Sequence, residues 1–181
     1  MEKALVKDEE DSILIQNLAI VELLKTLHYY KFLESDFYCK IPMQPQLKEV
    51  LGEIGINNTS TLLLMLYLLL VTAIELDKKG YNFNLNYTEQ LIRSKIIAID
   101  YNGADLNLEF KYSRFLRNSI SHCNTRFKEI NGVSAVVFQS QVKKINVIKF
   151  TLYTKDVGEI IDVLFNLISI TLNLKYFGNI V

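Results

Sequence analysis

The segment LLLMLYLLLVTAI covers Leu62–Ile74 and is composed mostly of leucine. It follows Asn57-Asn58-Thr59-Ser60 and is followed by Glu75 and Asp77, so polar residues bound it on both sides. A helix that crosses a membrane needs about 20 apolar residues, and this run has 13 apolar or uncharged residues. It therefore predicts a helix that is buried on most sides in the core of a soluble protein.

Further helices are predicted on both sides of this segment. Thr59 or Ser60 is the expected N-cap of the leucine-rich helix, and Lys78-Lys79-Gly80 is expected to end it. Asn86 is the expected N-cap of a helix over about 88–99, which the turn at 100–103 ends. Periodic apolar residues predict a helix over about 9–33, Pro45 can open a short helix to about residue 54, and another helix is expected over about 105–121. Asp156 starts a last helix that carries the apolar residues Val157, Ile160, Ile161, Leu164, Ile168 and Leu172.

Two short segments near the C-terminal end have a β pattern. Val133–Gln139 and Asn146–Tyr153 are rich in β-branched and aromatic residues, and the turn dipeptide Asn131-Gly132 precedes them. They predict a small β-hairpin before the last helix. The expected fold class is mainly α, a bundle of about five to six helices with this hairpin, in a single domain over residues 1–181.

The charge of the chain is balanced overall but uneven along the sequence. The 181 residues hold 20 Lys and Arg against 20 Asp and Glu, a formal net charge of zero. This excludes a nucleic-acid binder that is basic throughout. However, residues 110–155 hold nine basic residues against the single acid Glu129, a local charge of +8, so the remainder carries −8. A locally basic RNA-binding site therefore remains open.

The cysteines and histidines form no recognisable metal or redox motif. Cys39 and Cys123 are the only cysteines, which excludes a disulfide framework and favours the reduced cytoplasm, and the acidic N-terminus is unlike a signal peptide. Because His28, Cys39, His122 and Cys123 lack ligand spacing, we expect no metal. Because the sequence has no Gly-x-Gly-x-x-Gly or Walker loop, we also expect no cofactor. His28 is expected to pack at the edge of the core, and Cys123 to be a half-buried apolar residue.

One stretch, FLRNSISH at 115–122, carries groups suited to cleaving RNA. Arg117 supplies a permanently charged fork that matches phosphate oxygens. His122 supplies an imidazole, a group that takes and returns a proton near neutral pH. Because the 2′-hydroxyl of RNA can itself attack the phosphate, neither a metal nor a protein nucleophile is required. The alternative interpretation is a solvated arginine and a histidine stabilised by the helix dipole.

The spacing of the two charged groups sets a geometric condition. In a regular helix, residues five positions apart project about 140° from each other. Arg117 and His122 therefore reach one phosphate only if the helix end is distorted, if the arginine wraps round the helix, or if a second copy of the motif faces the first across a twofold axis.

The string Leu116–His122 resembles the Arg-polar-x-x-x-His motif of HEPN domains, the higher-eukaryote and prokaryote nucleotide-binding superfamily. The resemblance covers roughly residues 60–176. It implies a helical bundle that dimerises so that both motifs line one cleft. Many members are metal-independent RNA endonucleases, some as toxins or in phage defence, and others bind without catalysis. Carried over by position, Arg117 would stabilise the phosphate, Asn118 would be the polar helper, and His122 the acid and base.

This chain departs from the family at one position. Toxin members paired with a nucleotidyltransferase antitoxin often carry a tyrosine two residues after the histidine, where this chain has Asn124. The resemblance therefore does not extend to regulation by nucleotide transfer onto that tyrosine.

Two functions are open on the sequence alone. The first is a metal-independent HEPN-type RNA endonuclease that acts as a dimer, as a toxin or defence protein; the second is a non-catalytic module that binds RNA, a nucleotide or a protein. A purely structural helical protein is a third interpretation. The expected partners are RNA, a second copy of the chain and an antitoxin protein, with no membrane. The basic residues expected to bind RNA are Lys111, Arg114, Arg126 and Lys128.

Overall fold

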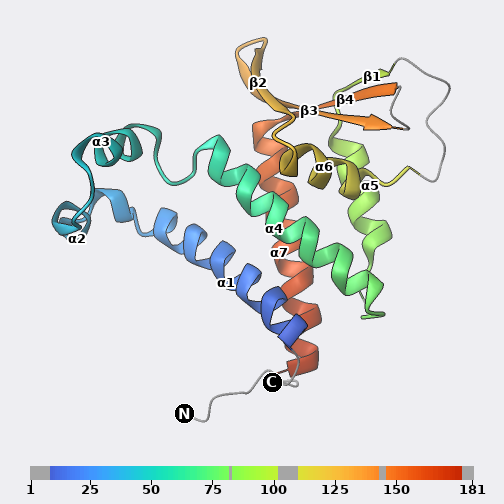
Figure 1. The fold of residues 1–181 in the computed structure, drawn as a ribbon, viewed down its shortest axis with the longest axis horizontal. Coiled ribbons are helices and arrows are strands. Elements are labelled where there is room, and N and C mark those ends of the chain that lie inside the picture. Colours follow the sequence, from blue (N-terminus) through green and yellow to red (C-terminus); the bar gives the residue numbers. More distant parts are fainter. Residues whose placement is uncertain (1–8, 82, 102–109, 143–145, 177–181) are drawn as a thin grey trace.

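The computed structural model describes residues 9–81, 83–101, 110–142 and 146–176 (Figure 1). Helices predominate in these residues, which confirms a mainly α fold. The elements in chain order are α1 (Glu9–Tyr29), the short 3-10 helix η1 (Phe32–Glu34), α2 (Asp36–Lys40), α3 (Pro45–Ile54), α4 (Thr59–Lys78), α5 (Leu85–Lys95), β1 (Ala98–Tyr101), α6 (Tyr112–Ser121), β2 (Thr125–Ile130), β3 (Val133–Val142), β4 (Asn146–Tyr153) and α7 (Thr154–Tyr176).

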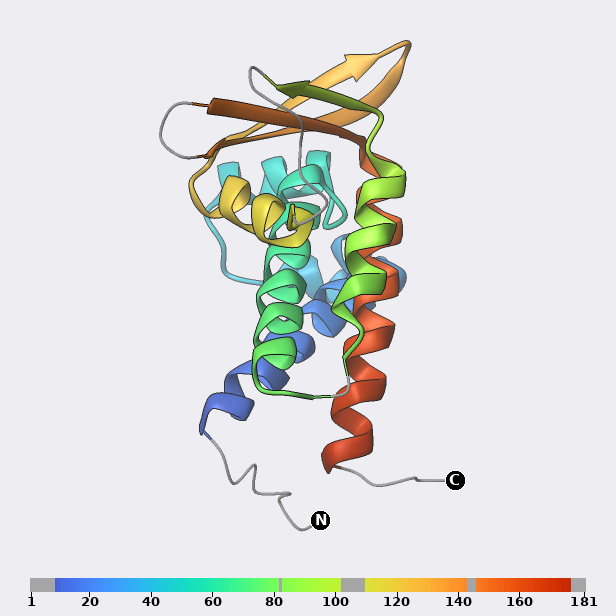
Figure 2. The ribbon, with the colours of Figure 1, turned by 90° about the vertical axis from the view of Figure 1, so that its right-hand side faces the viewer.

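The molecule has a helical body with a β-sheet across one end. Figures 1 and 2 show α4 beside α1 and α7, with the sheet above them and α6 between the sheet and the body. The core runs continuously from the helices into the sheet, because apolar side chains of both belong to one buried cluster. Its largest fully buried members include Leu66, Leu69 and Leu70 of α4, Ile160 and Leu164 of α7, and Phe138 and Phe150 of the sheet.

The leucine-rich segment forms the central helix α4, as predicted. Its N-cap is Asn58 rather than Thr59 or Ser60, because the Asn58 side chain accepts a hydrogen bond of 3.0 Å from the backbone of Thr61. The helix ends at Lys78, and Gly80 follows with a left-handed φ of 71°. Of the helices that the structure describes, α4 alone is long and apolar enough to cross a membrane, and 56% of its apolar window is buried inside the protein. Its position in the core accounts for its hydropathy.

The N-terminal segment is less regular than predicted. Helix α1 ends at Tyr29 instead of continuing to residue 33, since Lys31 adopts a left-handed φ of 50° and the chain enters η1 and α2. Pro45 opens α3, as predicted. His28 is exposed rather than packed at the edge of the core, because it lies in the last turn of α1, where the chain leaves the body.

The sheet is larger than the predicted hairpin. Its strands are antiparallel in the order β1-β4-β3-β2, and the predicted hairpin is the central pair, in which Phe138 of β3 lies opposite Phe150 of β4. The dipeptide Asn131-Gly132 forms the turn between β2 and β3, with φ values of 51° and 77°. Both residues occupy the left-handed region that a two-residue hairpin turn requires. The turn therefore lies where the sequence predicted it, whereas strand β2 before it was not predicted.

The predicted helix over 88–99 is displaced toward the N-terminus. Helix α5 spans Leu85–Lys95, and its N-cap is Asn84 rather than Asn86, since Asn84 accepts from the backbone of Tyr87 at 3.0 Å. The next residues leave the helix to pair with β4, beginning with a 2.9 Å hydrogen bond from the Ile97 N–H to the Thr151 carbonyl. Pairing with a distant strand thus overrides the local helical pattern.

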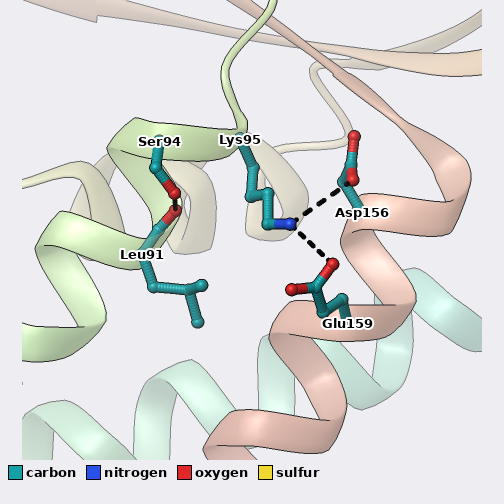
Figure 3. A network of polar contacts seen from close by, with 5 residues as sticks. All are labelled: Leu91, Ser94, Lys95, Asp156 and Glu159. Atoms are coloured by element: carbon teal, nitrogen blue, oxygen red, sulfur yellow. Dashed lines mark hydrogen bonds and ion pairs between the residues drawn. The ribbon is translucent and has the colours of Figure 1, made fainter.

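The end of α5 is attached to the start of α7 by charged side chains (Figure 3). The Lys95 ammonium lies 2.6 Å from a carboxylate oxygen of Glu159 and 3.8 Å from one of Asp156. The hydrogen bond to Glu159 is the largest of the effects that together raise the pKa of Lys95 above its ordinary value. These contacts link α5 to α7.

The two remaining helices differ from prediction only at their N-terminal ends. Helix α6 begins at Tyr112, whereas the prediction began near residue 105; positions 105–109 lie outside the described residues. Helix α7 begins at Thr154, two residues before Asp156. Its buried face consists of the predicted apolar residues, which are Val157, Ile160, Ile161, Leu164, Ile168 and Leu172.

Candidate functional site

The motif lies on α6, a short helix with one face buried beneath the sheet. Phe115, Leu116 and Ser119 are buried, and their spacing of three to four residues places them on one side of the helix. The Phe115 ring packs on Phe150 of β4, with 4.5 Å between ring centroids. The polar residues of the motif are thereby turned toward the other side of α6.

The start of α6 is fixed by a carboxylate on α5. The Ser113 hydroxyl donates a hydrogen bond to Oε1 of Glu89, and the Ser113 backbone N–H donates to Oε2 at 3.3 Å. Ser113 is fully buried. A carboxylate at a helix N-terminus is also stabilised by the positive end of the helix dipole. Glu89 therefore holds the motif helix in place relative to α5.

The end of α6 is attached to β3 through its backbone. The His122 N–H donates to the Asn118 carbonyl at 3.1 Å, and the Asn124 N–H donates to the Ser119 carbonyl at 2.8 Å. The Asn124 carbonyl in turn accepts from the Gln139 N–H of β3 at 2.9 Å. Three elements of the site are thus fixed relative to one another: the helix end, the link to β2 and one residue of β3.

Cys123 lies in this link and is exposed, not half-buried as predicted. Its φ of 53° is left-handed, and this conformation turns the chain out of α6 into β2. No glycine stands at this position to indicate the turn.

A pocket of about 470 Å³ lies where the helix end meets β3, and it is lined by Asn118, His122, Asn124, Gln139 and Ser140. The side chains of these residues are three carboxamides, an imidazole and a hydroxyl. Within the described part of the chain, none of these side chains forms a hydrogen bond with another protein group. Their polar groups are therefore available to a ligand. Asn124, Gln139 and Ser140 were not identified as site residues from the sequence.

Arg117 does not line this pocket. At about 100° per residue, it lies at one border of the polar face of α6, with His122 about 140° away at the other border and Asn118 between them. Its Nε atom is buried, and it has no hydrogen-bond partner among the described residues. Within one protomer, the structure therefore brings Asn118 and His122 together and leaves Arg117 apart.

The four residues predicted to bind RNA are all exposed, in two groups. Arg114 belongs to the first turn of α6, and Lys111 is the N-cap residue just before it, at the opposite end of the helix from His122. Arg126 and Lys128 are two residues apart on β2 and so share one face of the sheet. Arg126 lies opposite Val137, which makes Gln139 of the pocket its diagonal neighbour on that face. That face is turned away from α6, because Phe138, the neighbour of Gln139 in β3, lies opposite Phe150, on which Phe115 of α6 packs. The β2 pair is therefore near Gln139, on the outer face of the sheet.

Two other observations concern different kinds of site. A larger hollow of about 1080 Å³ is lined by residues of α1, η1, α3, α4 and α7 and by the links around them, and it contains no residue of the motif. In the residues that the structure describes, no three or more His, Cys, Asp or Glu side chains are grouped so that they could hold a metal ion. Independence of metal remains a prediction.

Comparison with known families identifies the fold. The family model described as HEPN pEK499 p136 matches residues 7–173, almost the whole chain. The chain belongs to this HEPN family. The match includes α6 with its motif and the sheet, so the HEPN resemblance noted from Leu116–His122 is confirmed. No curated protein and no solved structure matches this HEPN chain.

Proposed function

We propose that this HEPN domain is a metal-independent RNA endonuclease that acts as a homodimer. The observation that carries the proposal is the pocket at the end of α6, which is lined by both Asn118 and His122 and also by Gln139 of β3, the strand that pairs with the basic strand β2. An imidazole at the border of a basic surface is suited to moving protons at a bound phosphodiester.

The reaction follows from the groups present. His122 takes the proton of a ribose 2′-hydroxyl, whose oxygen attacks the adjacent phosphorus. The bond from phosphorus to the 5′-oxygen breaks, and His122 returns its proton to that leaving oxygen. The products are a 2′,3′-cyclic phosphate and a free 5′-hydroxyl. Arg117 stabilises the negative charge that develops on the phosphate oxygens, and Asn118 helps to orient the substrate.

A dimer supplies the missing part of the site. Because Arg117 and His122 project about 140° apart on α6, one protomer does not present both to one phosphate by its backbone alone. Two copies related by a twofold axis through the motif helices would place Arg117 of one protomer across from His122 of the other.

One observation favours the alternative of a module that binds RNA without cleaving it. Arg117 lies outside the pocket, and its Nε is buried without a partner among the described residues. In that case RNA binding would depend on salt concentration, since phosphate contacts release counterions, but no strand would break.

A ribonuclease of this kind fits a toxin or defence role in the cytoplasm, restrained by an antitoxin protein. Such a role predicts that expression of the wild-type chain slows cell growth, that His122→Ala does not, and that the antitoxin relieves the effect of the wild type.

The direct test is incubation of the purified protein with mixed RNA in EDTA. We expect wild type to cleave and His122→Ala and Arg117→Ala to lose most of the activity. Matched controls are His28→Ala and Arg93→Ala, since both residues are exposed and lie on α1 and α5, away from the pocket lining. Equal cleavage by wild type and His122→Ala would remove the reaction from this site.

A further inference from the structure

The pocket beside His122 is chemically unlike a phosphate-binding site. Its lining contains three carboxamides and one hydroxyl, and no Lys, Arg, Asp or Glu side chain. Phosphate groups in proteins are held by cations or by clustered backbone N–H groups. Neutral side chains that both donate and accept instead match a neutral partner with donors and acceptors of its own.

We propose that this pocket binds one unpaired nucleobase of the RNA substrate, the base next to the phosphate that is cleaved. The carboxamides of Asn124 and Gln139 hydrogen-bond to the edge of that base and so determine the sequence preference of cleavage. A carboxamide offers a donor and an acceptor side by side, the combination displayed on base edges. This inference rests on the proposed function for the choice of RNA as the ligand.

The size and state of the pocket agree with this ligand. Its volume of about 470 Å³ lies within the range of about 300–1,000 Å³ that is usual for small-molecule sites. Its side chains have no hydrogen-bond partner within the described part of the chain. A base that binds them therefore breaks no hydrogen bond among these described residues.

The backbone holds the two carboxamide residues at fixed places relative to the imidazole. Asn124 is joined by hydrogen bonds to Ser119 of the motif helix and to Gln139 of β3. Because strand residues alternate between faces, Gln139 approaches the pocket from the outer face of the sheet and His122 approaches it from the α6 face. In this proposal the base lies between them at the edge of β3, beyond the end of β2. This is the condition for a base contact to influence which phosphate reacts.

The charges on the neighbouring strands also fit. Gln139 lies directly opposite Lys149 of β4, and Lys149 is paired with Asp100 at 3.0 Å, which neutralises it. On the other side, Arg126 of β2 is the diagonal neighbour of Gln139, and it is exposed. The arrangement is a neutral base pocket with a cation at its border for a flanking phosphate. Because a base in a duplex already uses its pairing edge, the site selects single-stranded RNA.

The test separates base recognition from cleavage by using ligands that cannot be cut. Each of the four nucleoside 3′-monophosphates is titrated against wild type, Gln139→Leu and Gln139→Glu, with binding followed by calorimetry. We expect wild type to prefer one or two of the four bases by roughly five- to tenfold, the effect of one or two hydrogen bonds. Gln139→Leu should lose this preference.

Gln139→Glu keeps the size of the side chain and replaces its donor by an acceptor, so we expect it to change which base is preferred. Gln46→Leu, an exposed glutamine on α3, is the matched control and should behave as wild type. Thermal unfolding of each variant shows whether it is folded. If Gln139→Leu is not folded, Gln139→Glu and Asn124→Asp replace it in the comparison.

A second readout uses a randomised RNA whose cleavage ends are sequenced. Wild type should show one enriched base beside the cut, and Gln139→Leu should cut with a flattened preference. Base-selective binding without any cleavage would support the pocket and overturn the endonuclease proposal. Equal binding of all four nucleotides, no binding at all, or a preference unchanged in both Gln139 variants would overturn the pocket proposal.

Discussion

Mixing two inactive variants, Arg117→Ala and His122→Ala, is expected to restore about a quarter of the wild-type cleavage rate. The expectation comes from the geometry of α6, on which the two side chains project about 140° apart. If one protomer supplies Arg117 and its partner supplies His122, each mixed dimer contains one site with both groups and one site with neither.

The magnitude follows from counting sites. Free exchange of protomers gives about half mixed dimers, and each of these has one working site where a wild-type dimer has two, which together gives about one quarter. The assay mixes the two variants at equal concentration, allows exchange by refolding or co-expression, and measures RNA cleavage in EDTA. Different affinity tags on the two variants report how many mixed dimers formed.

Two results separate the possibilities. A mixture that contains mixed dimers but stays at the activity of the separate variants would refute the shared site, since a site built within one protomer is broken in every chain. A mixture of two differently tagged His122→Ala preparations is the control, and it should stay inactive.

The other predictions concern stability. Phe150→Ala removes a fully buried ring that packs on α6, and it should lower the free energy of unfolding, measured by urea titration, by about 3–5 kcal/mol. The control Phe127→Ala removes a half-exposed ring and should lower it by under about 1 kcal/mol. Asn58→Ala removes the N-cap of α4 and should cost about 1 kcal/mol, measured as a lower urea midpoint. Contacts with Glu159 raise the pKa of Lys95 in the folded state. The difference in unfolding free energy between wild type and Lys95→Met should therefore be constant below the pKa of an unfolded lysine, and it should diminish as pH rises through the folded-state pKa. A difference that stays the same up to strongly alkaline pH would contradict this expectation.

The helices of the body were predictable because their signals are local. The leucine-rich run, Pro45 and the apolar stripe of α7 each determine their element through residues that are close in sequence. The exact N-caps were not predictable in this way. Asn58 lies directly before the predicted caps Thr59 and Ser60, and Asn84 lies two residues before the predicted cap Asn86.

The edge strands could not be read in the same way. Residues 98–99 were predicted to end a helix and residues 100–101 to begin the turn after it, but residues 98–101 form β1 by pairing with β4. For β2 a signal was available, because an Asn-Gly hairpin turn requires a strand on both sides, and Thr125–Ile130 precedes it.

The candidate site was predictable only in part. The sequence pattern identified His122 and Asn118, which the structure places in one pocket, and the helical spacing already indicated that Arg117 points elsewhere. Gln139 could not be found, because it lies on β3, far from the motif in sequence, and is brought to the site by sheet pairing and by the hydrogen bond between its backbone and the Asn124 carbonyl.

The central claim is that His122 of this HEPN domain drives attack by the 2′-hydroxyl of RNA. The measurement that tests it most directly incubates wild type and His122→Ala in EDTA with one single-stranded RNA and with its 2′-O-methyl counterpart of the same sequence. We predict that only wild type cuts, only the unmodified RNA is cut, and the upstream fragment ends in a cyclic phosphate. Cleavage of the 2′-O-methyl strand, or undiminished cleavage by His122→Ala, would contradict the account.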